Sequence, residues 1–268
     1  MGRARRIWWV AALAAASCSD DIGLPDAPPP VVDAPPGTLQ VSWTIGHDSA
    51  PLTCTEIAGN SVTVEIVEQG MFFGLVDSFS CASGMGTSRA LDPGTYDVTL
   101  TLVGSGGTLD GPHTTIGVVV SSNQSATVAP VAFDVDPTGT LQLRISTGTG
   151  VDNCAAMPAG AGITATRLEL RDAGGTCVPT MFAIAAGATS GLPAGTYASD
   201  CAGATYGCIA ADQDVTATGV SSGQHTMALT GLVGATACWR RTSSFTVRAA
   251  GQTTMISPQL TRDTVLCP

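Results

Sequence analysis

The sequence predicts an all-β protein made of two tandem β-sandwich domains that follow a disordered tether rich in proline and aspartate. Three observations support this prediction. Apolar and polar residues alternate along several short segments, Gly and Pro separate these segments, and a unit of about 100 residues occurs twice. Val, Thr, Leu and Ala dominate and charged residues make up only 12% of the chain, a balance typical of β-rich extracellular proteins.

Residues 1–17 have the form of a secretory signal segment. Three arginines precede an apolar run over residues 7–16, which is too short to cross a bilayer as a helix of about 20 residues. Small residues then lead to Cys18. This arrangement resembles a bacterial lipobox, although Ala15 stands where that motif prefers leucine. The resemblance implies that the thiol of Cys18 is acylated and that Cys18 becomes the mature N-terminus.

The cysteine count supports lipidation of Cys18. The chain has nine cysteines, and an odd number in an exported protein leaves one thiol without a partner. If Cys18 carries lipid, the remaining eight suit disulfides in an oxidising compartment. The alternative is an ordinary signal peptide followed by a disulfide-bonded cysteine.

Residues 18–36 are predicted to hold the anchor site and the tether. The segment 19–36 contains six prolines, four aspartates and no aromatic residue, so it cannot bury enough apolar surface to fold. At about 3.1 Å per residue in polyproline II, it reaches roughly 50 Å. Because Ser19 follows Cys18, the sorting rule of some Gram-negative lipoproteins implies an outer-membrane address.

Three motifs recur in the same order at offsets of 100 to 102 residues, which predicts domains over 37–136 and 137–268. The repeated motifs are GTLQVSWTIG (37–46) and GTLQLRISTG (139–148), LDPGTY (91–96) and LPAGTY (192–197), and VSSNQ (120–124) and VSSGQ (220–224). The L-x-x-G-T-Y turn resembles that of bacterial Ig-like, prealbumin-like modules such as carboxypeptidase regulatory-like domains. This resemblance implies a sandwich without an active site.

The second copy is longer than the first. GQTTMISPQL (251–260) matches NQSATVAPVAF (123–133) better than GQHTMALTGL (223–232) does. We therefore expect the last strand of this copy at 245–260, with about 27 residues inserted before it. Elaborated loops on a rigid scaffold often carry binding, which makes the cysteine-rich loops of this copy the candidate contact region.

The repetition predicts the disulfides Cys54–Cys81 and Cys154–Cys177, because both pairs recur at similar positions. The last four cysteines allow three pairings. We favour Cys201–Cys208 and Cys238–Cys267. The rival interpretation is a structural zinc site formed by these four thiols, which an exported location and the lack of a paired C-x-x-C pattern disfavour.

No motif in the chain predicts catalysis. GVSSG places Ser221 at the centre of a G-x-S-x-G pattern, but that pattern needs a strand, a sharp turn and a helix, whereas its surroundings are β-like. The histidines His47, His113 and His225 are scattered without a metalloprotease motif. A triad assembled by the fold stays open as an alternative.

The aspartate pairs have the i, i+2 spacing of calcium-binding oxygens but lack a full set of six to eight ligands. These pairs are Asp134 with Asp136 and Asp212 with Asp214. We expect them to be solvated, and we expect no metal, cofactor or catalytic residue in this chain.

Trp239, Arg240 and Arg241 form the one candidate binding cluster, since an aromatic side chain beside arginines is frequent at binding hot spots. The interpretation that we prefer is that Trp239 packs in the core of the second domain while both arginines are solvated, since tryptophan is usually largely buried.

The charge of the chain excludes nucleic acid as a partner. Removal of residues 1–17 takes away three of the 11 basic residues and none of the 21 acidic ones, which leaves a formal net charge of −13. Lysine is absent, so the chain lacks a basic surface, and anionic lipid repels it.

Together these features resemble the surface lipoproteins of high-GC bacteria, myxobacteria included. We expect a non-enzymatic lipoprotein of the outer membrane that serves as a binding, structural or adhesion module. Its partners would be the membrane, through the lipid on Cys18, and a surface protein or glycan. The alternative is a secreted hydrolase or carbohydrate-binding protein with its site in the loops of 137–268.

Overall fold

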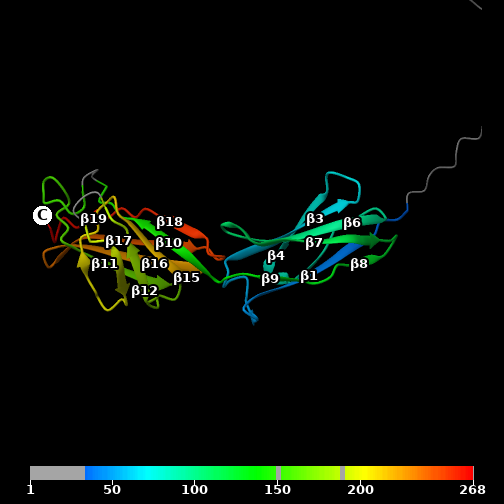
Figure 1. The fold of residues 1–268 in the computed structure, drawn as a ribbon, viewed down its shortest axis with the longest axis horizontal. Coiled ribbons are helices and arrows are strands. Elements are labelled where there is room, and N and C mark those ends of the chain that lie inside the picture. The colour runs from blue at the N-terminus through cyan, green and yellow to red at the C-terminus, as the bar shows by residue number, and fades with distance from the viewer. Residues whose placement is uncertain (1–33, 149–151, 188–190, 268) are drawn as a thin grey trace, which may run out of the picture. The chain divides into compact units, whose positions relative to one another are not determined.

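The computed structural model describes residues 34–148, 152–187 and 191–267. The predicted signal segment, Cys18 and nearly all of the predicted tether lie outside the described residues. Within them the chain forms β-strands and one 3₁₀ turn, η1 (Cys81–Ser83), and no α-helix. The strands fall into two successive sandwiches, each with two sheets (Figure 1). The predicted fold class, all-β with two tandem sandwiches, is confirmed.

The first sandwich encloses its core between the sheet β4-β3-β6-β7 and a sheet centred on β1. Its strands are β1 (Thr38–His47), β2 (Ala50–Pro51), β3 (Gly59–Glu68), β4 (Leu75–Ser80), β5 (Met85–Thr87), β6 (Gly94–Gly104), β7 (Gly107–Val120), β8 (Ser125–Thr127) and β9 (Val131–Asp134). Alternate residues of β1, from Leu39 to Ile45, are at most 9% exposed, as the two-residue period predicts. The indole N–H of Trp43 donates to the carbonyl of Cys81 at 3.0 Å, so this core tryptophan has its polar atom satisfied.

The second sandwich packs the sheet β13-β12-β15-β10-β18 against the sheet β14-β11-β16-β17-β19. Its strands are β10 (Thr138–Arg144), β11 (Ala165–Asp172), β12 (Thr180–Ile184), β13 (Gly195–Ser199), β14 (Tyr206–Gly207), β15 (Asp214–Ser221), β16 (Gly223–Val233), β17 (Thr236–Val247), β18 (Thr253–Ile256) and β19 (Thr261–Arg262). Phe182, which is fully buried, and Leu141 and Leu143 lie at the centre of its core.

β8 in the first sandwich and β18 in the second each pair in parallel with the first strand of their sandwich, and the register is the same in both. Thr38 lies opposite Ser125, and Thr140 lies opposite Thr253. The turns before β8 and β18 make matching hydrogen bonds, in which Thr38 N donates to Gln124 O at 3.0 Å and Thr140 N donates to Gln252 O at 2.9 Å. The predicted match of 251–260 with 123–133 is therefore confirmed.

Two other expectations about the repeat are wrong. The segment 245–260 is not one strand, since β17 ends at Val247 and β18 starts at Thr253 in the opposite sheet. VSSGQ (220–224) forms the hairpin between β15 and β16, whereas VSSNQ (120–124) joins β7 to β8. The extra length of the second copy includes β12 and β13, which come between β11 and β14, whereas β4 follows β3 directly in the first sandwich.

The structure contains the predicted disulfides Cys54–Cys81 and Cys238–Cys267. The predicted Cys154–Cys177 and Cys201–Cys208 are wrong, because Cys154 pairs with Cys208 and Cys177 with Cys201.

The inserted β12–β13 hairpin explains the exchange of partners. Cys177 precedes β12 and Cys201 follows β13, and the pairing of Thr180 with Ser199 brings the two cysteines together at a Cα–Cα distance of 6.0 Å. Cys208 follows β14, which pairs with β11 as β4 pairs with β3. Cys154–Cys208 is therefore the structural counterpart of Cys54–Cys81.

Candidate functional site

The G-x-S-x-G pattern at Ser221 does not form a nucleophile site. Ser221 ends β15 in a tight hairpin that leads into the strand β16, where the pattern requires a helix. The nearby His225 is 2% exposed and stacks on Phe245. Its Nε2 atom lies 2.7 Å from the main-chain carbonyl of Ser221, so the imidazole is held by the backbone of this serine and not by its hydroxyl. General-base activation of Ser221 has no geometric basis in this hairpin.

The predicted Trp239–Arg240–Arg241 cluster is divided by the fold, which contradicts its role as a single exposed hot spot. Trp239 is 6% exposed and its indole N–H donates to Ala161 O at 3.1 Å, so it belongs to the core of the second sandwich. Arg240 and Arg241 are exposed. As neighbours on a strand they point to opposite faces of β17.

The aspartates have partners in the protein. Asp214 forms an ion pair with Arg144 at 2.8 Å, and Asp136 Oδ1 accepts hydrogen bonds from the amide and hydroxyl of Thr138. Asp134 contacts His47. In the part of the chain that the structure describes, no three His, Cys, Asp or Glu side chains gather closely enough to hold a metal ion.

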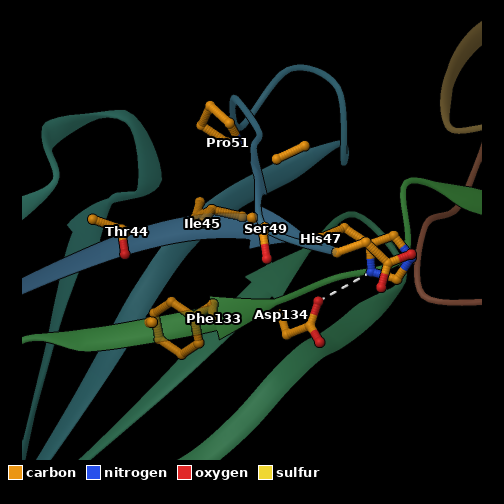
Figure 2. Close-up of a pocket in the computed structure, with 11 residues that line it drawn as sticks. Thr44, Ile45, His47, Ser49, Pro51, Phe133 and Asp134 are labelled. Atoms are coloured by element: carbon orange, nitrogen blue, oxygen red, sulfur yellow. Dashed lines mark hydrogen bonds and ion pairs between the residues drawn. The ribbon is translucent and has the colours of Figure 1, made fainter.

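The fold brings His47 close to Asp134, although the two residues are far apart in the sequence. The sequence did not predict this contact. Asp134 is the last residue of β9, and β9 runs parallel to β1, so the ends of both strands lie side by side. His47 Nδ1 lies 3.0 Å from Asp134 Oδ1, and Asp48 lies 3.7 Å from the other ring nitrogen. The pair borders a surface pocket of ≈ 500 Å³ with apolar walls that include Ile45 and Phe133 (Figure 2).

A tight hairpin forms one wall of this pocket. Asp48 and Ser49 both have positive φ, 47° and 68°, and connect β1 to β2 as a two-residue turn. Among the hydrogen bonds of the described residues, none joins the Ser49 hydroxyl to His47, and Figure 2 shows the imidazole bonded to Asp134. The pocket therefore offers an imidazole–carboxylate pair that can hold polar groups of a ligand, but no activated nucleophile.

A second imidazole–carboxylate pair supports the first. Asp110 Oδ2 lies 3.1 Å from His113 Nε2 and accepts the amide of Asp134 at 2.9 Å. Burial raises the pKa of the Asp110 carboxyl, but the hydrogen bonds from Asp134, His113 and Gly111 outweigh burial, so its pKa lies below 3.8. The hydrogen bond to Asp134 is the largest cause that raises the pKa of His47 above 6.5.

The cysteine-rich end of the second sandwich holds a different, smaller pocket of ≈ 250 Å³. Trp239 and the Cys238–Cys267 disulfide line it, together with Met157 and Leu266, which are each 50% exposed. The pocket lies near the β16–β17 turn, at the end of the sandwich opposite to Pro137 and Ser222. Sequence reasoning located this region through its cysteines but missed Met157 and Leu266, which carry no motif.

In the described residues, no helix has the length and apolarity needed to span a membrane. No known protein-family description matches the chain, and no curated protein does either.

Three solved structures of bacterial proteins match most of the chain at low sequence identity. The Bacillus anthracis TIE protein is 13% identical with a TM-score of 0.40, and the match covers 85% of this chain but 34% of that one. The minor pilin GBS52 of Streptococcus agalactiae is 12% identical with a TM-score of 0.27, and the match covers 85% of this chain and 96% of that one. A putative adhesin from Bacteroides ovatus is 10% identical with a TM-score of 0.26, and the match covers 83% and 88% of the two chains. The chain thus spans about a third of the TIE protein, and none of these likenesses identifies a ligand or partner for it.

Proposed function

We propose that this protein is a non-enzymatic lipoprotein of the bacterial outer membrane, acylated at Cys18, that binds a surface protein through the cysteine-rich end of its second sandwich. One observation carries the choice of site. A pocket beside the Cys238–Cys267 disulfide is lined by Met157 and Leu266, which are each 50% exposed, and Val265, the neighbour of Leu266 in the chain, is 88% exposed. Apolar side chains that gather at a pocket are typical of protein contact sites.

The wall of this pocket is held in place before any partner arrives. Asp263 donates its amide to Cys238 O at 2.8 Å, and its carboxylate accepts the amides of Val265 and Leu266 at 3.1 and 3.0 Å. The disulfide then fixes Cys267 to β17. Because the segment is already ordered, binding loses less conformational entropy than it would with a free loop.

The pocket fits one apolar side chain of a partner. Its volume of ≈ 250 Å³ is below the range for small-molecule sites, which is about 300–1,000 Å³. Its lining consists of Trp239, the disulfide and three apolar side chains, Met157, Val233 and Leu266, together with the polar residues Thr236 and Arg262. The small volume and the exposed apolar side chains of Met157 and Leu266 favour a protein partner over a glycan. His225 contacts the main-chain carbonyl of Ser221 and not its hydroxyl, which supports a non-enzymatic role.

In vivo photo-crosslinking tests the proposal. A photoreactive residue replaces Leu266 in the full chain, and a matched variant carries it at Met255, which is 73% exposed on β18. We expect a discrete crosslinked protein from position 266 and not from position 255. No adduct at 266, or equal adducts at both positions, would contradict the binding site. Turnover of a model ester or glycoside by the purified protein, abolished by a variant in the second sandwich, would contradict the non-enzymatic role.

A further inference from the structure

The hairpin between β3 and β4 carries apolar side chains that are exposed to solvent, two of them aromatic. Phe72 is 96% exposed, Phe73 92% and Met71 62%. Phenylalanine is normally among the more buried residue types, so two adjacent rings at a loop tip indicate a surface that is covered in the working protein.

The apolar surface continues onto the end of β7. Ile116 is 75% exposed and Val119 is 62% exposed. Pairing through β6 brings these residues level with the base of the hairpin, since Glu68 and Val118 both lie opposite Tyr96. Asp97 ties the two parts together, because its Oδ1 accepts hydrogen bonds from the Gln69 side chain and from Gly117 N, both at 3.0 Å. We call Met71, Phe72, Phe73, Ile116 and Val119 the apolar tip.

The chain enters the first sandwich at this same end (Figure 1). Gly37 pairs with Leu91, and a Cβ atom on Gly37 would lie 2.7 Å from Val120. Val120 is in turn opposite Gly94, at the start of β6. The predicted lipid on Cys18 precedes this entry point by the segment 19–34, which cannot exceed about 55 Å even when fully extended at about 3.5 Å per residue. A membrane that holds the lipid is therefore within reach of the apolar tip.

We propose that the apolar tip inserts into the interface of the membrane that carries the Cys18 lipid, and so docks the first sandwich on the bilayer. This inference rests on the lipid anchor of the proposed function. Phenylalanine at a loop tip gains from leaving water for the acyl-chain boundary, as apolar faces of interfacial helices do. The occupant is a neutral lipid surface, because the chain has no lysine and a net charge of −13 without residues 1–17, and Glu68 and Asp97 flank the tip. Anionic headgroups would oppose docking.

Vesicle binding by the mature chain with Cys18→Ser, which carries no lipid, isolates the contribution of the tip. We expect this chain to sediment with phosphatidylcholine vesicles. Phe72→Ser with Phe73→Ser should weaken binding at least about tenfold, since binding strength scales with buried apolar area. Met181→Ser with Met255→Ser, at positions 56% and 73% exposed on the second sandwich, is the matched control and should bind as the parent does. Replacing a third of the lipid with phosphatidylglycerol should weaken binding, and added salt should restore it.

A second variant reports insertion directly. Phe73→Trp places an indole at the tip, and brominated lipid should quench the fluorescence of this indole. The fluorescence of the parent chain should not change with brominated lipid, because its tryptophans Trp43 and Trp239 are only 4% and 6% exposed. Equal vesicle binding with and without Phe72 and Phe73, or unquenched emission from the Phe73→Trp variant, would overturn the inference. Self-association that the serine variant abolishes, without vesicle binding, would assign the tip to a second copy instead. If the native protein carries no lipid on Cys18, the lipid anchor of the proposed function is contradicted, whereas the vesicle binding of the tip is measured independently. A missing crosslink at Leu266 would contradict the proposed binding site and would not affect the vesicle result.

Discussion

Tyr96 donates its phenolic hydroxyl to the main-chain carbonyl of Asp92 at 2.8 Å. Tyr197 makes the same contact with the carbonyl of Pro193 at 2.7 Å. Each tyrosine ends an L-x-x-G-T-Y motif and ties the turn to the strand that follows, in the manner of the tyrosine corner of Ig-like sandwiches. The strands themselves differ in position, since β6 is central in its sheet and β13 lies at an edge. The repeated motif therefore specifies a hydrogen-bonded turn and not a place in the sheet.

Replacement of Tyr96 by Phe should lower the free energy of unfolding by about 1 kcal/mol, because the ring is 6% exposed and its hydrogen bond is lost. Tyr197→Phe should lower it less, since water reaches the more exposed Tyr197 hydroxyl and its partner. Urea denaturation of both variants checks the order. Equal losses, or a larger loss for Tyr197→Phe, would contradict it.

Cys154→Ser should release a reactive thiol at Cys208, because the structure pairs these two residues. Alkylation without reduction, followed by peptide mass spectrometry, identifies the labelled cysteine. Label on Cys177 would instead support the Cys154–Cys177 disulfide expected from the sequence repeat. The double variant Cys154→Ser with Cys208→Ser removes a crosslink with a sequence separation of 54 and should lower the free energy of unfolding by about 4 kcal/mol on the chain-entropy model.

Asp134→Asn should lower the pKa of His47 toward 6.5, because the hydrogen bond to Asp134 is the largest cause of its elevation. Asp48→Asn is the matched control and should lower the pKa less, since Asp48 acts through charge alone at 3.7 Å. Titration of the His47 ring protons by NMR measures both. The raised pKa means that the pair stabilises the fold fully below pH 6.5 and that this contribution is lost as the pH rises through the pKa of the folded state. Unchanged titration in Asp134→Asn would contradict the contact.

Trp43 and Trp239 are the only tryptophans after residue 17, so the fluorescence of the mature chain reports on the two cores. In Trp43→Phe, the emission of Trp239 should be blue-shifted and poorly quenched by acrylamide, because this side chain is 6% exposed. Strong quenching by acrylamide would show that Trp239 is exposed and would contradict its place in the core. Arg240→Ala, at an exposed neighbour, should leave the spectrum unchanged.

Local patterns in the sequence predicted the strands well. The alternation from Leu39 to Ile45 places one face of β1 in a core wherever that strand lies in the sandwich, because side chains of a strand point alternately to its two faces. The match between 123–133 and 251–260 held for a similar reason. Both segments pair with the repeated GTLQ strand, so a similar sequence meets a similar partner.

Contacts between residues that are distant in the sequence were not predicted. The pairing of Cys154 with Cys208 depends on the β12–β13 insertion. Because of this insertion, Cys208, the counterpart of Cys81, lies further along the chain but keeps the equivalent place in the fold. The proximity of His47 and Asp134 depends on the parallel pairing of β1 with β9.

The sequence by itself determined the fold class, the repeat and the residues that face each core, since these follow from the period of a strand and from local turns. Only the tertiary structure decided how the cysteines pair and that the apolar tip lies where the chain enters the first sandwich. These depend on which strands become neighbours, and strand order is set by the packing of whole sheets and not by any one segment.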